Sequence, residues 1–175
     1  MIPQFGPRSL PEVYLWVDAG TGCTSLDAKF KSPPGWGAIM MSVGIDGVCT
    51  VRGCGAAFSS LECEGASGPL LELRVIKEAL TRWIPSLHRK RVLLGNDCLP
   101  AMQAFVKGWS PVETMQKVIR EAYITLLPQF MCLRLFHIPR SHPTIRICDL
   151  LGRGQSAAAS ELCSQTFGAP LITNA

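Results

Sequence analysis

Residues 92–101 read VLLGNDCLPA, an apolar run that ends on a carboxylate just before a proline and a helix-like pattern. Val92, Leu93 and Leu94 predict a buried strand, and Asp97 stands at its carboxyl end. In sheets that contain parallel strands, functional sites form at the carboxyl ends of those strands. We therefore expect Asp97 to belong to a site if other carboxylates meet it at that edge.

A second strand that ends on an acid lies near the beginning of the chain. Residues 13–18 read VYLWVD and are apolar on both faces, which is typical of a central buried strand. Residues 35–43 and 48–58, separated by the turn sequence GIDG, predict a β-hairpin. Asp18 and Asp97 thus stand at equivalent positions on two predicted strands.

The rest of the chain predicts further helices and strands. The expected elements are, in order, a helix at 69–84, a strand at 92–96, helices at 100–106 and 110–127, a strand at 131–138, and helices at 144–151 and 156–166. Ser110, Pro111 and Glu113 are interpreted as an N-cap, a first-turn proline and a capping-box acid.

Antiparallel strands followed by strand-helix-strand crossovers indicate an α/β fold. We expect a five-stranded mixed sheet whose first three strands are antiparallel and whose later strands are parallel, flanked by helices. This domain is expected to span residues 1–155. A C-terminal helix and loose tail are expected at 156–175.

Composition is typical of a compact globular protein. The 175 residues have a mass of 19.0 kDa, and 47% of them are hydrophobic and 17% charged, so the chain can bury its own core. The mean hydropathy of +0.23 predicts that a neighbouring protein covers part of the surface. The net charge of +4 suits a polyanionic partner.

Two classes of protein are disfavoured by the sequence. No apolar run approaches the ~18 residues that span a bilayer, and the first residues lack a signal pattern. We therefore expect no membrane partner and an intracellular location, cytoplasmic or nuclear. The eight cysteines include no CxxC pair, so we expect reduced thiols that pack as small hydrophobic groups rather than zinc ligands or disulfides.

Two carboxylates at neighbouring strand ends repel each other unless a cation lies between them. Oxygen ligands without a Cys/His set favour Mg²⁺. Helical geometry offers a third acid, because Glu72 borders the apolar face of its helix, whereas Glu78 lies beside Arg74 and Arg82 and is interpreted as a solvated pair. Asp149, within the apolar stretch IRICDLLG, is a fourth candidate because an acid there needs a partner.

Five stretches, in this order, resemble the ribonuclease H domain of retroelement reverse transcriptases of the LTR, tyrosine-recombinase or related pararetroviral kind. They are VDAG (17–20), GWGAIM (35–40), LELRVIKEAL (71–80), GNDCLPAM (95–102) and HIPRSHPTIRICDLLGRG (137–154). The resemblance implies the ribonuclease H-like fold and a metal-dependent endonuclease that cuts the RNA strand of RNA/DNA hybrids, leaving 5′-phosphates. It also implies association, covalent or not, with a reverse transcriptase polymerase domain.

By position, the four acids of that family fall on Asp18, Glu72, Asp97 and Asp149. The resemblance implies that they hold two Mg²⁺ ions, for which Mn²⁺ can substitute, with Asp18 bridging both. Glu72 and Asp97 would help to hold the ion near the leaving 3′ oxygen, and Asp149 the ion that activates water. His142 resembles a mobile-loop histidine that assists product release, with an ordinary exposed histidine as the alternative.

Nucleic-acid contacts are expected from two segments. Lys107 and Trp109 resemble the start of a basic, tryptophan-containing segment that contacts the DNA strand, with a core tryptophan as the alternative. Arg89, Lys90 and Arg91 are candidates for phosphate contacts, which would make affinity fall steeply with salt. A solvated basic surface is the alternative for them.

The chain departs from the family pattern at Gly20, at Asn96, at residues 146–148 before Asp149, and in a longer loop at 21–34. These departures leave open a catalytically weak or inactive nucleic-acid-binding or scaffold domain of the same fold. An integrase or junction resolvase is a second alternative, although such enzymes usually lack the acid on the first long helix. A Rossmann-type enzyme is disfavoured because no GxGxxG loop follows the first strand.

Overall fold

One mixed sheet organises the computed structural model, which describes residues 12–20, 34–44, 46–129 and 131–173. The strands are β1 (Glu12–Gly20), β2 (Gly35–Val43), β3 (Cys49–Ala57), β4 (Arg91–Asn96), β5 (Cys132–His137) and β6 (Leu171–Thr173). The helices are α1 (Ser60–Cys63), α2 (Gly68–Arg82), α3 (Ile84–Leu87), α4 (Leu99–Lys107), α5 (Glu113–Leu126), α6 (Pro143–Gly152) and α7 (Ser156–Phe167), with a 3₁₀ turn at Leu127–Gln129. The expected long loop at 21–34 lies, except for Pro34, outside the described residues.

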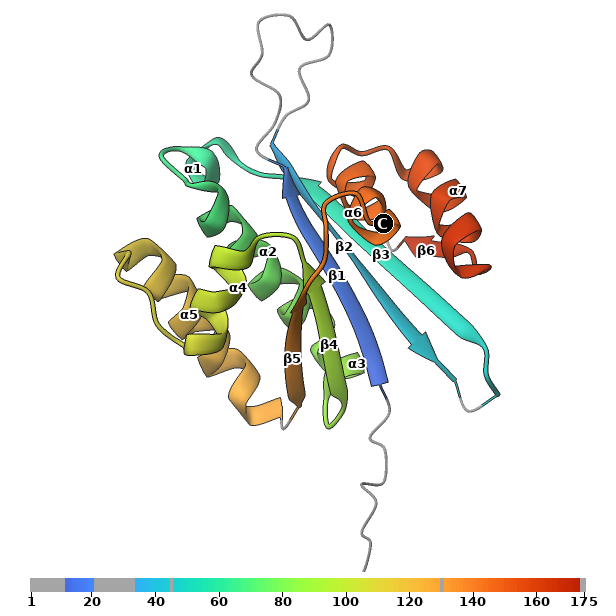
Figure 1. The fold of residues 1–175 in the computed structure, drawn as a ribbon, viewed down its shortest axis with the longest axis horizontal. Helices are drawn as coiled ribbons and strands as arrows, with labels where there is room; N and C mark the ends of the chain where they lie inside the picture. The colour runs from blue at the N-terminus through green and yellow to red at the C-terminus, as the bar shows by residue number, and fades with distance from the viewer. Residues whose placement is uncertain (1–11, 21–33, 45, 130, 174–175) are drawn as a thin grey trace, which may run out of the picture.

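The strand order across the sheet is β5-β4-β1-β2-β3-β6. β1 pairs antiparallel with β2 and parallel with β4, and β4 pairs parallel with β5. The carboxyl ends of β1, β4 and β5 therefore lie side by side at one end of the strands, at the top of Figure 1. This end is called the carboxyl edge of the sheet. The expected mixed α/β sheet with flanking helices is confirmed.

The strand count was one short. Residues 171–173, expected in a loose tail, form β6 and pair in parallel with Val51–Gly53 of β3. α7 also packs on the sheet, because the rings of Trp16 and Phe167 lie 5.6 Å apart. A three-residue strand carries too little periodicity to be recognised in a sequence, and it forms here because the outer edge of β3 offers unpaired backbone groups.

Local signals explain α2, the helix that carries Glu72. The Ser67 side chain caps its first turn by accepting a hydrogen bond from the Leu70 amide, and a proline follows in the first turn. Its apolar stripe, which includes the fully buried Leu73 and Ile76, faces β1. The helix was expected at 69–84 from this apolar stripe, and the structure has it at Gly68–Arg82.

The expected start of α5 was wrong. The helix begins at Glu113, with Val112 rather than Ser110 at the N-cap position. The Ser110 hydroxyl accepts a hydrogen bond from the Val112 amide at 3.2 Å, and the Ser110 amide donates to Gln116. Ser110 thus closes a local turn before the helix, because its hydroxyl reaches the amide two residues on.

Two cores lie on opposite faces of the sheet. The larger involves α2, α4 and α5, and the smaller lies under α6 and α7, as Figure 1 shows. α6 approaches β2 so closely that a Cβ on Gly37 would overlap the Cys148 carbonyl, and one on Gly35 the Gly152 carbonyl. Glycine is required there because backbone lies against backbone. Among the described helices, none has the length and apolar character to cross a membrane.

Candidate metal centre at the strand ends

Three acids from distant parts of the chain meet at the carboxyl edge of the sheet. Asp18 lies near the end of β1, Asp97 directly follows β4, and Glu72 lies in the second turn of α2. One carboxylate oxygen from each lies within 4.8 Å of the other two. The parallel pairing of β1 with β4 produces this convergence, because it places both strand ends side by side.

Glu72 is held by two neutral hydrogen-bond donors. The Ala19 amide donates to its Oε1 at 3.2 Å, and the Asn96 Nδ2 donates to its Oε2 at 2.8 Å. Glu72 is 6% exposed and Asp18 is 2% exposed. Neither is placed in an ion pair with Lys, Arg or His, since the ion pairs of the described residues involve other acids.

Burial and mutual repulsion disfavour the ionised acids. Burial, followed by the charges of Asp97 and Asp149, raises the pKa of Asp18 from 3.8 to about 7, against the opposing charges of Arg140 and Arg153. Burial, followed by the charge of Asp18, raises the pKa of Glu72 from 4.5 to about 8, and the hydrogen bond from Asn96 opposes this. A divalent cation would relieve both effects, so clustered hard oxygen donors with elevated pKa values fit such an ion.

The fourth acid, Asp149, lies beside the triad but does not join it. Its Oδ1 lies 3.8 Å from where a Cβ on Gly20 would be, so it faces the end of β1. The same oxygen accepts a hydrogen bond from Arg153 Nε at 2.8 Å, one helical turn further along α6. Asp149 is therefore near enough to repel Asp18 but is paired with a cation of its own helix.

His142 is the N-cap residue of α6. Its Nδ1 lies 2.7 Å from the Thr144 hydroxyl and also accepts a hydrogen bond from the Thr144 amide. The expected role of His142 in product release stays a prediction. Another histidine, His137 at the end of β5, contacts a residue of the triad directly, because its Nε2 is 3.1 Å from the Asp97 carbonyl.

The two expected nucleic-acid segments lie on different elements. Lys107 is the last residue of α4 and Trp109 follows it, and the helix begins two positions after Asp97. The nine residues of the helix span about 13 Å. Trp109 is 60% exposed, which excludes the core alternative.

Arg89, Lys90 and Arg91 lie at the amino end of β4, about 20 Å from Asp97 by the rise of an extended strand. Arg91 is ion-paired with Glu12 at 2.8 Å. Their nucleic-acid role stays a prediction, but they lie at the opposite edge of the sheet from the acids.

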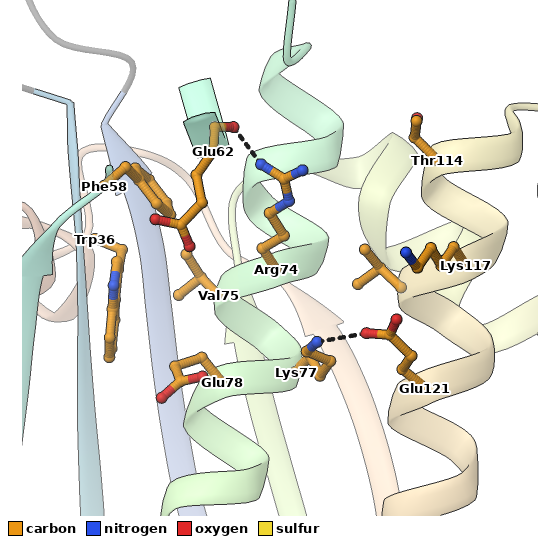
Figure 2. Close-up of a pocket in the computed structure, with 11 residues that line it drawn as sticks. Trp36, Phe58, Glu62, Arg74, Val75, Lys77, Glu78, Thr114, Lys117 and Glu121 are labelled. Carbon is orange, nitrogen blue, oxygen red and sulfur yellow. Dashed lines mark hydrogen bonds and ion pairs between the residues drawn. The ribbon is translucent and has the colours of Figure 1, made fainter. Parts of the chain in front are cut away.

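A groove of about 550 Å³ lies beside α2, away from the triad. Figure 2 shows its walls, with the Lys77–Glu121 ion pair between α2 and α5 and Arg74 donating to the Glu62 carbonyl. Its charged lining residues are Arg74, Lys77, Lys117, Glu62, Glu78 and Glu121. Three cations and three acids cancel, so the groove lacks the positive charge that a phosphate backbone requires.

Two residues of the site were missed as participants. The sequence patterns predicted no role in the site for Asn96 or Arg153. A polar residue at the end of an apolar strand could have indicated Asn96, because buried amides require partners. The spacing of four residues between Asp149 and Arg153 could have indicated their pairing.

Comparisons with known proteins find likeness in structure alone: no family model and no curated protein sequence matches the chain. The N-terminal ribonuclease H domain of a Mycobacterium tuberculosis protein has a TM-score of 0.60 at 16% identity, covering 86% of this chain and 97% of that one. LC11-RNase H1, isolated from compost, in complex with an RNA/DNA hybrid has a TM-score of 0.53 at 15% identity, covering 83% and 99%.

A prototype foamy virus protease-reverse transcriptase has a TM-score of 0.51 at 15% identity. The match covers 94% of this chain but 22% of the viral one. At such identities the likeness shows the fold, which is ribonuclease H-like, as expected.

Proposed function

We propose that this chain is a metal-dependent endonuclease that hydrolyses the RNA strand of RNA/DNA hybrids. One observation carries the proposal: oxygens of Asp18, Glu72 and Asp97 gather within 4.8 Å at the carboxyl edge of the sheet. Such a cluster destabilises the metal-free protein, because two of its acids are buried and have no cationic partner among the residues that the structure describes. A site retained at that cost is a strong candidate for a functional one.

Asp18, Glu72 and Asp97 would hold divalent metal, Mg²⁺ by preference with Mn²⁺ as a substitute, and Asp149 would hold a second ion beside Asp18. Two such ions stabilise the entering and leaving oxygens of a phosphodiester and lower the pKa of the attacking water. The chain's own part is to fix these acids. Asp18, near the end of β1, lies close enough to Asp97 and Asp149 for their charges to act on it, and the Ala19 and Asn96 donors orient Glu72.

The hybrid is the proposed substrate for two reasons. The fold is shared with a protein solved in complex with an RNA/DNA hybrid, and Trp109 is exposed beside Lys107 at the far end of α4. An exposed aromatic ring next to a cation suits contact with a nucleic-acid strand. Selection of RNA over DNA would come from 2′-hydroxyl contacts across the wide minor groove.

The chain is also proposed to work with a reverse transcriptase polymerase. The chain matches about a fifth of a viral protease-reverse transcriptase in structure. Its mean hydropathy is consistent with a surface partly covered by a neighbouring domain. Residues 1–155 would form the nuclease unit. Residues 156–175 would brace it through α7, whose Ala159 and Cys163 are buried against α6 and the sheet.

Incubation of RNA/DNA hybrid, double-stranded RNA and double-stranded DNA with Mg²⁺ or Mn²⁺ tests the activity. We expect cleavage of the RNA strand of the hybrid only, with 5′-phosphate ends, and none with Asp18→Asn. Folded protein that leaves the hybrid intact with both metals would refute the nuclease proposal.

A second candidate, a binding or scaffold domain without catalysis, is favoured by one observation. Asp149 is occupied by Arg153 rather than gathered with the triad. Hybrid binding without uptake of either metal by calorimetry would support that candidate over the nuclease.

A further inference from the structure

Asn96 lies beside the three acids and contacts one of them, Glu72, directly. It is the last residue of β4, it directly precedes Asp97, and it is 0% exposed. A buried amide without partners would destabilise the fold. Its hydrogen bonds therefore show what the residue does.

Within the described residues, the side chain of Asn96 makes three hydrogen bonds, each to an acid or to the chain neighbour of an acid. Nδ2 donates to Glu72 Oε2 at 2.8 Å and to the Val17 carbonyl, next to Asp18, at 3.0 Å. Oδ1 accepts from the Cys98 amide, next to Asp97, at 2.9 Å. The amide thereby ties β1, α2 and the start of α4 to one point.

Among side chains of this length, only asparagine can make all three hydrogen bonds. The site requires two N–H donors and one acceptor on a side chain with a single methylene. An ionised aspartate would present an oxygen to the Glu72 carboxylate and the Val17 carbonyl, and a serine or threonine hydroxyl has one proton to donate. The orientation of the amide is also set, because exchanging its nitrogen and oxygen would oppose two acceptors.

We infer that Asn96 is a positioning residue that preassembles Asp18, Glu72 and Asp97 for metal before any metal arrives. It acts mainly through Glu72. The amide of Asn96 is a neutral donor, so it holds the Glu72 carboxylate in place without supplying a positive charge that would compete with a metal ion. The inference rests on the proposed function for its purpose, but the contacts that carry it are independent of hydrolysis. Outer partners of metal ligands typically change metal affinity about 10- to 100-fold when removed.

Calorimetric titration of Mn²⁺ into the wild-type chain, Asn96→Ser and Ser110→Ala tests this without a nucleic acid. Ser110 is the matched control, because it is also buried and hydrogen-bonded but lies in the turn before α5. We expect the Mn²⁺ dissociation constant to rise about 10- to 100-fold in Asn96→Ser and to stay within about twofold in Ser110→Ala. An Asn96→Ser affinity within about twofold of wild type overturns the inference. Should that variant not fold, Asn96→Thr, which fills more of the volume of the amide and offers one donor instead of two, takes its place with the same expected rise.

A double-mutant cycle separates this inference from the proposed function. The unfolding equilibrium constant is measured without metal for wild type, Asn96→Ser, Glu72→Met and the double variant. We expect the two changes to be non-additive by more than about fivefold, because coupled residues share an interaction. If even the wild type takes up no metal, the nuclease proposal fails, and the cycle then decides only whether Asn96 positions Glu72. Additive changes would overturn that positioning role, and non-additive changes would support it.

Discussion

Arg153 Nε lies 2.8 Å from Asp149 Oδ1, so the fourth acid of the site is paired within its own helix. Both side chains are partly exposed, at 43% and 32%, and pairs of this kind contribute about 0.3–0.5 kcal/mol. The pairing is weak enough for a divalent ion to displace it. Under the proposed function, Arg153 would therefore compete with a metal ion for Asp149.

We predict that Arg153→Gln lowers the Mn²⁺ concentration at half-saturation about twofold, because about 0.4 kcal/mol corresponds to that factor. Calorimetry without nucleic acid measures it. Arg120→Gln, which removes the same charge from α5, should leave the affinity unchanged. Equal affinity in all three proteins would show that the ion pair does not compete with metal.

Asp97→Asn is predicted to abolish metal uptake and cleavage while stabilising the metal-free protein by about 1 kcal/mol at pH 8. The physical reason is that the charge of Asp97 repels both Asp18 and Glu72. Urea unfolding in EDTA measures the stability. Asp46→Asn, in the exposed turn between β2 and β3, should change neither quantity. A destabilised Asp97→Asn protein would contradict the repulsion argument.

The metal-free protein should lose stability as pH rises from 5 to 8. The folded-state pKa values of Asp18 and Glu72, about 7 and about 8, exceed the unfolded ones, so the folded state binds more protons in this window. The stability that this gives is complete near pH 4 and is lost as pH rises through the folded values, by about 1.4 kcal/mol per pH unit and proton.

The acids with lowered pKa values, Glu12, Glu62 and Glu121, are ionised throughout that window and do not offset the loss. Thermal unfolding between pH 5 and pH 8 in EDTA, and again in saturating Mg²⁺, measures the dependence. We expect Mg²⁺ to flatten it. A profile that is flat without metal would mean that the triad is not strained.

Gly37→Ala should destabilise the protein by about 1–3 kcal/mol. The added methyl would overlap the Cys148 carbonyl, so α6 must shift and carry Asp149 with it. Gly68→Ala, at the start of α2 where an added Cβ meets nothing within 4 Å, should be neutral or stabilise by about 0.4–1 kcal/mol. Chemical denaturation compares them, and equal stabilities would contradict the close packing of α6 on β2.

Trp109→Ala should weaken hybrid binding about three- to tenfold without loss of stability, since a lost aromatic contact is worth about 1 kcal/mol. Fluorescence anisotropy measures the affinity for the hybrid, and EDTA in the buffer prevents cleavage during the measurement. Ile124→Ala on α5 is the control, because Ile124 is a comparably exposed apolar side chain. Unchanged affinity in Trp109→Ala would remove this residue from the binding surface.

Much of the fold followed from local pattern. Unbroken apolar runs such as 13–18 and 92–96 predicted buried strands, and the apolar stripe that begins after Pro69 predicted α2. The proximity of Asp18 and Asp97 followed as well, because parallel neighbours end at the same edge. These features depend on hydrophobic periodicity and on strand direction, and both can be inferred from the order of residues along the chain.

Other features depend on partners that are distant in sequence, and only the tertiary structure decided them. Asn96 acquires its role from Val17 and Glu72, which lie 79 and 24 positions away. β6 forms because the outer edge of β3 is free to pair. The position of Asp149 outside the triad depends on how α6 packs against the glycines of β2. Composition and spacing determined which acids could meet, whereas packing determined which ones do. The reason is that the contacts of a side chain depend on how closely distant backbone segments pack, and not on the residues next to it in the sequence.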